Sequence, residues 1–324
     1  MLYVTTREKY DAFTTARTLV SSVGPDGGLY LPYKMPLLTA EELETHAEQS
    51  FGQNVAAMLN RFFGCGLSGW DVEFSIGRYP VKLAAMGQKI LMAECWRNLE
   101  GSYEKLERHL AARICRKGTR DVVVTSWLRI AIRIALLTGV FGEMRRNGFR
   151  DCVDIAVPDG DFSLAMAVWY GREMGLPVAN IIVGCGDGSD AWNLLHNGQL
   201  RSGAMPELER LIYGTLGIEA AQRLGRGESI SLRPDQLQLL RKGLFSAVVS
   251  KDRRDAAIPN VYSTNSYILE PNAAVAYSAL MDYRARTGEG RVALILEDTS
   301  PAEQVTRIAA ALGLTADRVK ELLR

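Results

Sequence analysis

The sequence predicts an α/β fold in which a twisted, mostly parallel sheet is flanked by helices. Three apolar runs, at 154–157, 180–183 and 291–296, indicate buried strands. Helical patterns lie between these runs, and an alternation of strands and helices is typical of a sheet covered by helices. Upstream of these runs, the amino-terminal part shows mainly helical patterns, so we expect a mostly helical segment there.

The composition is that of an ordinary globular protein. The chain has 324 residues, of which 47% are hydrophobic and 23% are charged, and its net charge is +1. This charge gives no general attraction to nucleic acid or membranes. The first residues lack the apolar core of a signal peptide, and there is no run of about 18 apolar residues. Five dispersed cysteines and three scattered histidines favour a reducing cytoplasm and predict no metal site.

Five helices are predicted from local patterns. A helical run covers 12–22, and two helices cover 38–63, the first capped by Thr39 with Glu42 three residues later. Residues 127–146 carry apolar side chains at helical spacing and predict a core helix. An amphipathic helix is expected over 231–251, entered through Pro234.

The stretch 154–163 combines a buried strand, a tight Pro-Asp-Gly loop and the start of a helix. In α/β proteins, ligands bind at the carboxyl ends of such strands, and a glycine loop that opens a helix often holds a phosphate. This loop, however, carries Asp159 and Asp161, whose carboxylates would repel a phosphate. The alternative is that Asp161 caps a helix that starts near Phe162, where a carboxylate is favoured by the helix dipole.

The first residues resemble a known family. Thr5-Thr-Arg7 and the block Pro25-Asp-Gly-Gly-Leu-Tyr30 are similar to the amino-terminal segment of threonine synthases. This resemblance implies a reduced type II pyridoxal phosphate scaffold, similar to tryptophan synthase β. It also implies a threonine synthase-like segment at 1–80 and an α/β core domain at 81–324.

The family's catalytic lysine has no direct counterpart. Threonine synthases carry Glu-Leu-Phe-His-Gly-Pro-Thr-x-Ala-Phe-Lys-Asp, and aligned without gaps Glu94, Trp96 and Tyr103 keep that character. The position of the Schiff-base lysine falls on Glu104, and Lys105 is its neighbour. One residue turns a helical side chain by about 100°. No catalytic residue is therefore assigned, because a carboxylate forms no imine and covalent chemistry would need Lys105. The alternative is a solvated helix face.

Trp127 and Arg129 match the family's Ser-Ile-Asn-Trp-Ala-Arg segment. In threonine synthases a small domain lies between the lysine segment and this tryptophan, and it carries the loop that binds the substrate carboxylate. Here the intervening stretch is short, so we expect that the small domain is deleted between about 107 and 120.

The family's cofactor-binding positions are altered. Of Val-Pro-Thr-Gly-Asn-Phe-Gly, the loop that holds the cofactor phosphate, Gly160 and Phe162 are kept, while Asp161 replaces asparagine and Ser163 replaces the second glycine. An ionised aspartate only accepts hydrogen bonds. Farther on, Asp298 stands for the threonine that faces the pyridine nitrogen, and Thr299 follows it. The alternative for both is a turn that caps a helix from residue 302. The family's His-Thr pair has become Asn272-Ala273.

Three hypotheses follow. The first is a threonine synthase-like protein without pyridoxal phosphate catalysis, which acts as a binding or partner protein; we then expect no cofactor. Loss of the small domain would expose surface that favours a homo-oligomer or another protein. The second is a residual pyridoxal phosphate-dependent lyase or threonine synthase, if the family site is retained. The third is acid–base or metal chemistry by Asp159, Asp161 and Glu104. In each case the small-molecule ligand is unknown.

Overall fold

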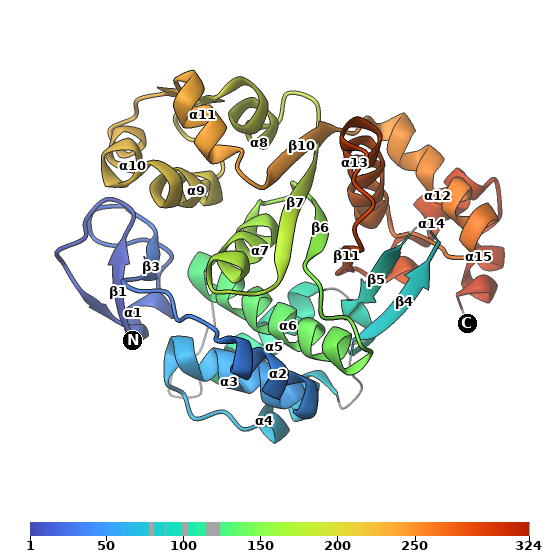
Figure 1. Cartoon of the computed structure of the whole chain (residues 1–324), viewed down its shortest axis with the longest axis horizontal. Helices are drawn as coiled ribbons and strands as arrows, with labels where there is room; N and C mark the ends of the chain where they lie inside the picture. The colour runs from blue at the N-terminus through green and yellow to red at the C-terminus, as the bar shows by residue number, and fades with distance from the viewer. Residues whose placement is uncertain (78–80, 88, 99–102, 115–123, 324) are drawn as a thin grey trace.

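The central element is a twisted sheet. The computed structural model describes residues 1–77, 81–87, 89–98, 103–114 and 124–323. Six of the described strands form the sheet, in the spatial order β10-β7-β6-β11-β5-β4 (Figure 1). They are β4 (Lys82–Met86), β5 (Ile90–Glu94), β6 (Val153–Pro158), β7 (Val178–Cys185), β10 (Leu244–Val248) and β11 (Ala293–Glu297). Neighbouring strands are parallel except for β4, which pairs antiparallel with β5 at one edge. The predicted mostly parallel sheet is confirmed.

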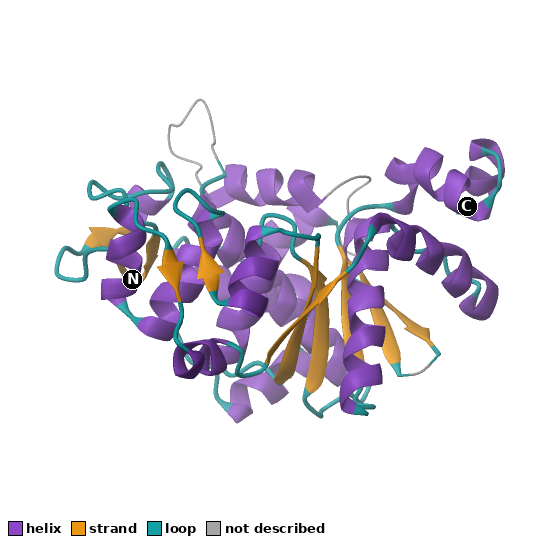
Figure 2. Ribbon diagram, turned by 90° about the horizontal axis from the view of Figure 1, so that it is seen from above, coloured by secondary structure: helices purple, strands orange, loops and turns teal. Residues whose placement is uncertain are grey.

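Helices cover both faces of this sheet (Figure 2). Successive side chains of a strand point to opposite faces. Along β6, Ile155 and Val157 accordingly belong to one apolar core and Ala156 to the other. The first core includes α3 (Phe51–Phe63), α6 (Ser126–Arg146) and α7 (Ser163–Glu173), and the second includes α12 (Lys251–Asn265), α13 (Pro271–Thr287) and α14 (Val305–Leu312). The predicted core helix at 127–146 corresponds to α6. Among the described helices, none is long and apolar enough to cross a bilayer.

The amino-terminal segment begins with a small antiparallel sheet, β2-β1-β3, and continues as helices. Its elements are β1 (Leu2–Thr5), β2 (Phe13–Thr14), α1 (Thr15–Thr18), β3 (Tyr30–Pro32), α2 (Ala40–Glu48) and α4 (Gly69–Ile76), with α3 between the last two. The capping box at Thr39 is confirmed, because its hydroxyl accepts the Glu42 N–H and the Glu42 carboxylate accepts the Thr39 N–H. The predicted helix at 12–22 is wrong in length, because Phe13 and Thr14 pair with β1 instead.

The predicted helix at 231–251 is also wrong. Residues Pro234–Leu240 form the short α11, the chain turns at Gly243, and the run that follows becomes the edge strand β10. Gly243 has a φ of +68°, a left-handed conformation that ends the helix. The apolar run after it pairs in parallel with β7, so tertiary pairing overrides the helical pattern.

The remaining described elements lie outside the central sheet. α5 (Tyr103–Ile114) precedes α6. A group formed by β8 (Gln199–Leu200), α9 (Pro206–Leu216), α10 (Ile218–Gly225), β9 (Ile230–Ser231) and α11 lies next to the amino-terminal sheet in Figure 1. Short turns and helices complete the chain: Cys95–Asn98, α8 (Asp190–Trp192), Asn193–Asn197, Pro301–Gln304 and α15 (Ala316–Leu322). The expected deletion between about 107 and 120 spans the end of α5 and residues 115–120, which lie outside the described residues.

Candidate functional site

The loop after β6 lies at the carboxyl end of the parallel strands, where α/β folds bind ligands. Gly160 has a φ of +44° and Phe162 a φ of +62°, so the chain turns sharply before α7 begins at Ser163. A phenylalanine rarely adopts this left-handed conformation. Its ring is buried, with 1% of the residue exposed, and this anchors the loop in the core.

Asp159 directs its carboxylate to the backbone. Its two oxygens accept the N–H groups of Gly160 at 2.9 Å and Gly186 at 3.1 Å. Gly186 follows β7, so Asp159 joins the ends of two neighbouring strands.

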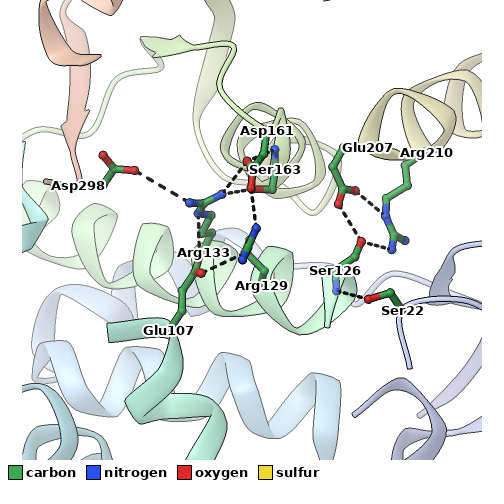
Figure 3. Close-up of polar contacts among 10 residues, drawn as sticks. All are labelled: Ser22, Glu107, Ser126, Arg129, Arg133, Asp161, Ser163, Glu207, Arg210 and Asp298. Carbon is green, nitrogen blue, oxygen red and sulfur yellow. Dashed lines mark hydrogen bonds and ion pairs between the residues drawn. The ribbon is translucent and has the colours of Figure 1, made fainter. Parts of the chain in front are cut away.

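Asp161 directs its carboxylate to the first turn of α7 and to α6 (Figure 3). One oxygen accepts the Ser163 N–H at 3.0 Å and also the Ser163 hydroxyl, and the other lies 2.7 Å from Arg129 Nη1. Arg133 Nη1 lies 3.4 Å from the first oxygen and also donates to the Ser163 hydroxyl. Burial acts to raise the pKa of Asp161, but Arg133 and Ser163 outweigh it and hold the pKa below its ordinary value. The prediction that Asp161 is the N-cap residue is wrong, because Phe162 holds that position. Asp161 lies one residue earlier, and its carboxylate accepts the first N–H of the helix, from Ser163.

A second carboxylate, Glu107 on α5, completes this arrangement. Its oxygens lie 3.1 Å from Arg129 Nε and 3.1 Å from Arg133 Nε. Glu107 is almost entirely buried, and this burial raises its pKa although both arginines oppose the shift. Two arginines of one helix therefore lie between two carboxylates, one buried and one at the crevice. We name Arg129, Arg133, Glu107, Asp161 and Ser163 the arginine cluster.

Asp298 and Thr299 follow β11 on the other side of the crevice. A carboxylate oxygen of Asp298 lies 4.0 Å from Arg133 Nη2. Burial raises the pKa of Asp298, and Arg133 acts against this shift. The prediction that Asp298 or Thr299 caps the next helix is wrong. Ser300 provides the cap, because its hydroxyl accepts the Ala302 N–H and Pro301 fixes the first position of the turn.

A crevice of about 490 Å³ lies between these two strand ends. Its lining brings together four of the predicted site residues: Gly160, Asp161, Asp298 and Thr299. Phe162 and Ser163 are not part of the lining; both are buried. The complete lining is Arg133, Pro158, Asp159, Gly160, Asp161, Leu164, Asn272, Asp298, Thr299, Glu303 and Gln304.

The residues at the lysine position lie on α5. The side chain of Glu104 lies outside the described part of the structure. Lys105 is exposed, whereas Leu106 and Leu110 of the same helix are buried. Because successive helical residues differ by about 100°, Lys105 lies nearly opposite the face that packs inward. It is not among the residues that line the crevice.

A group of buried carboxylates lies next to Asp298. Glu297 accepts hydrogen bonds from Trp96 Nε1 and the Tyr267 hydroxyl, both at 2.8 Å, and from the Glu270 N–H at 3.1 Å. Glu270 caps α13 by accepting the N–H groups of its first turn. Burial raises the pKa of Glu270 to about 8, with the charges of Asp298 and Glu297 adding to the shift. This carboxyl group therefore gains a proton in the folded protein near neutral pH.

One turn before Arg129, a second polar network connects α6 to α9 and the amino-terminal segment (Figure 3). Ser126 donates to Glu207 at 2.7 Å and accepts from Arg210 at 2.9 Å, and its N–H donates to the Ser22 hydroxyl at 3.0 Å. Arg210 also pairs with Glu207 at 2.8 Å and donates to the Tyr30 carbonyl. We name Ser22, Ser126, Glu207 and Arg210 the polar clamp.

Sequence reasoning identified the loop but not its partners. Arg129 was matched to a family position, but no role was predicted for Arg133 or Glu107. One signal was present: Glu107 stands between Leu106 and Leu110 on the apolar face of its helix, where an acidic residue needs a partner.

Sequence comparison and structure comparison both find threonine synthases among the similar proteins. Residues 2–73 match the family model described as the threonine synthase N terminus. A threonine synthase of Schizosaccharomyces pombe is 22% identical in an alignment of 233 residues. The match covers 59% of this chain and 45% of that protein. A threonine synthase of Escherichia coli K12 is 27% identical over 173 residues, 53% of this chain and 38% of that protein. The matched regions thus span less than half of these relatives.

A crystal structure of pyridoxal phosphate-bound threonine synthase from Brucella melitensis superposes with a TM-score of 0.83. It is 17% identical, over 100% of this chain and 94% of that chain. This likeness confirms the predicted fold class, the type II pyridoxal phosphate scaffold.

Proposed function

We propose that this chain, a member of the threonine synthase family, has lost pyridoxal phosphate catalysis and acts as a binding or partner protein. The observation that carries the proposal is the lack of a lysine among the described residues that line the crevice. A Schiff base needs a lysine amine beside the cofactor. The nearest candidate in sequence, Lys105, is exposed on the side of α5 away from its packed face.

The charge of the crevice supports the same conclusion. Its lining holds one cation, Arg133, and four carboxylates, on Asp159, Asp161, Asp298 and Glu303. Arg133 already contacts Glu107 and Asp161. A phosphate dianion placed in this crevice would therefore meet mainly negative charge. On this proposal the residues do not fit pyridoxal phosphate.

The residue at the family position that faces the pyridine nitrogen also supports the proposed loss of catalysis. The resemblance implies a hydroxyl there, and this chain has Asp298 instead. Burial raises the pKa of the Asp298 carboxyl, and the charge of Asp161 adds to this shift. The His-Thr pair of the family is replaced by Asn272-Ala273, which removes an imidazole and a hydroxyl and leaves one amide, that of Asn272, at the crevice.

The two alternatives each have a specific test. Residual lyase chemistry requires covalent cofactor binding through Lys105. Metal chemistry requires Asp159 and Asp161 to bind a cation, yet the first is engaged by backbone N–H groups and the second by two arginines. Thermal stabilisation by a divalent cation that Asp161→Asn abolishes would support the metal alternative over the proposal.

The direct test of the proposal is a pyridoxal phosphate titration of the purified wild-type chain. We expect no visible Schiff-base absorbance above that of free cofactor, and no difference between wild type and Lys105→Ala. An absorbance that Lys105→Ala removes would establish the lyase alternative. Isolation of the chain from its native cell tests the partner role: we expect a homo-oligomer or a stoichiometric complex, and recovery only as a lone monomer would contradict it.

A further inference from the structure

We infer that the Asp161 carboxylate is the built-in occupant of an oxyanion site made by the amino terminus of α7, Ser163, Arg129 and Arg133. The inference deepens the proposed function, because it explains how the chain excludes phosphate from its own crevice. It predicts that removing this one carboxylate creates a binding site for inorganic phosphate or a phosphate monoester.

The donors around the carboxylate are those that bind an oxyanion. One is a backbone N–H in the first turn of α7, which has 11 residues. A second is the Ser163 hydroxyl, and two more are the guanidinium groups at 2.7 Å and 3.4 Å. Free N–H groups, the helix dipole and arginine together form a typical anion site. Here an anion is already present at that position, and it comes from the chain itself.

The charges of the arginine cluster balance only while Asp161 is present. Arg129 and Arg133 carry two positive charges, and Glu107 and Asp161 carry two negative charges when ionised. Glu107 and Arg133 are buried, with 1% and 9% of their side chains exposed. Neither can readily turn to solvent to change its environment. Removal of the Asp161 charge therefore leaves Arg129 and Arg133 without their carboxylate partner at the start of α7, which favours binding of another anion there, although Asp159, Asp298 and Glu303 still line the crevice.

The position is open to ligands from solution. The Asp161 side chain is 48% exposed and borders the 490 Å³ crevice. A shorter residue at this position would open space next to Arg133, the donor that lines the crevice. The loop itself is held independently, because the Phe162 ring is buried and the Asp159 carboxylate binds two backbone N–H groups. The donors should accordingly keep their places without the Asp161 carboxylate.

Asp161→Ala, with inorganic phosphate as the probe, tests this inference. Phosphate binding is measured by calorimetry and by thermal shift at constant ionic strength, with chloride as the reference salt. We expect Asp161→Ala to bind phosphate at least about tenfold more tightly than wild type, and its melting temperature to rise with phosphate concentration. Adding Arg133→Gln to this variant should abolish the gain.

Asp159→Ala is the matched control. It removes a carboxylate from the same loop and the same crevice, but one that contacts no arginine within 4 Å among the described residues. We expect no gain in phosphate affinity from it. An equal gain in Asp159→Ala and Asp161→Ala would mean that only the net charge of the crevice matters, and it would overturn the inference.

Asp161→Ser is the second variant, since it keeps a hydrogen-bonding group beside the first turn of α7. The inference would be overturned if the folded variants bound phosphate no more tightly than wild type. Failure of both variants to fold would mean that the carboxylate is a structural cap, which also contradicts it. The titration uses no cofactor, so a coloured wild-type complex with pyridoxal phosphate would contradict only the proposed function.

Discussion

Two arginine–carboxylate groups contact α6 one turn apart, at Ser126 and at Arg129, and they differ in their exposure to water. In the polar clamp, Arg210 is completely buried and Glu207 has 8% of its side chain exposed. In the arginine cluster, Arg129 and Asp161 are 34% and 48% exposed. The first group joins three segments of the chain, whereas the second borders a crevice. The same ion-pair chemistry can therefore fix a fold or control access to a site, depending on burial.

The largest loss of stability is expected in the polar clamp. Arg210→Met leaves Glu207 buried without its cation, and removing one partner of a buried pair costs about 3–5 kcal/mol of the free energy of unfolding. Denaturant unfolding of wild type and variant measures this loss. The double variant Arg210→Met/Glu207→Gln should recover part of it, because no uncompensated charge remains. A loss below 1 kcal/mol would show that the clamp is not structural.

The buried carboxyl of Glu270 should give a pH-dependent effect. Its pKa is about 8 in the folded protein and near its ordinary value of 4.5 when unfolded. Between these pH values the native state holds more protons, so its contribution to stability is full below pH 4.5 and is lost as the pH rises to 8. We expect a loss of about 4 kcal/mol in the free energy of unfolding over this range.

Glu270→Gln keeps a hydrogen-bond acceptor for α13 but does not titrate. Chemical unfolding at a series of pH values should therefore show a flatter stability profile for this variant than for wild type. Equal slopes for the two proteins between pH 5 and pH 8 would mean that another group is responsible.

A smaller effect is expected at Asp161. Its carboxylate accepts the Ser163 N–H at the start of α7, and loss of one such hydrogen bond costs about 1 kcal/mol. Thermal or chemical unfolding of Asp161→Ala should accordingly show less destabilisation than Arg210→Met. A loss as large as that of the clamp would remove the distinction between the two groups, and would mean that the arginine cluster is primarily structural.

The smallest effect is expected at a pair on the surface. Arg318 and Glu321 lie 2.8 Å apart on α15, with 59% of each side chain exposed. Because solvent screens such a pair, Arg318→Ala should change the free energy of unfolding by less than about 0.5 kcal/mol. This variant sets the baseline for the other three, and a larger loss would show that proximity alone, without burial, stabilises this protein.

The sequence predicted the fold where local pattern and tertiary environment agree. The apolar runs at 154–157 and 180–183 are buried on both faces, and α6 has clear helical spacing, so each was found. The edge strand β10 was missed because its pattern continues that of α11, and only pairing with β7 distinguishes the two. β4 was missed because it is a short edge strand that contains a lysine and two alanines, residues that do not favour strands.

The site was predicted only in part, for a similar reason. Gly160, Asp161, Asp298 and Thr299 were identified by their resemblance to family positions, and they lie around one crevice. The contacts of Asp161 with Arg129 and Arg133 depend on how α6 packs against α7, which no short pattern encodes. The role of these residues toward a cofactor stays a prediction.

Trapping with borohydride tests the central claim, the loss of pyridoxal phosphate chemistry, most directly. The wild-type chain is incubated with pyridoxal phosphate, reduced, and analysed by intact mass and peptide mapping, with pyridoxal as a control for unspecific labelling of surface lysines. We predict no stoichiometric adduct on a single lysine, and the same weak labelling with both aldehydes. One adduct per chain on Lys105, formed with pyridoxal phosphate and not with pyridoxal, would contradict the proposed loss of catalysis.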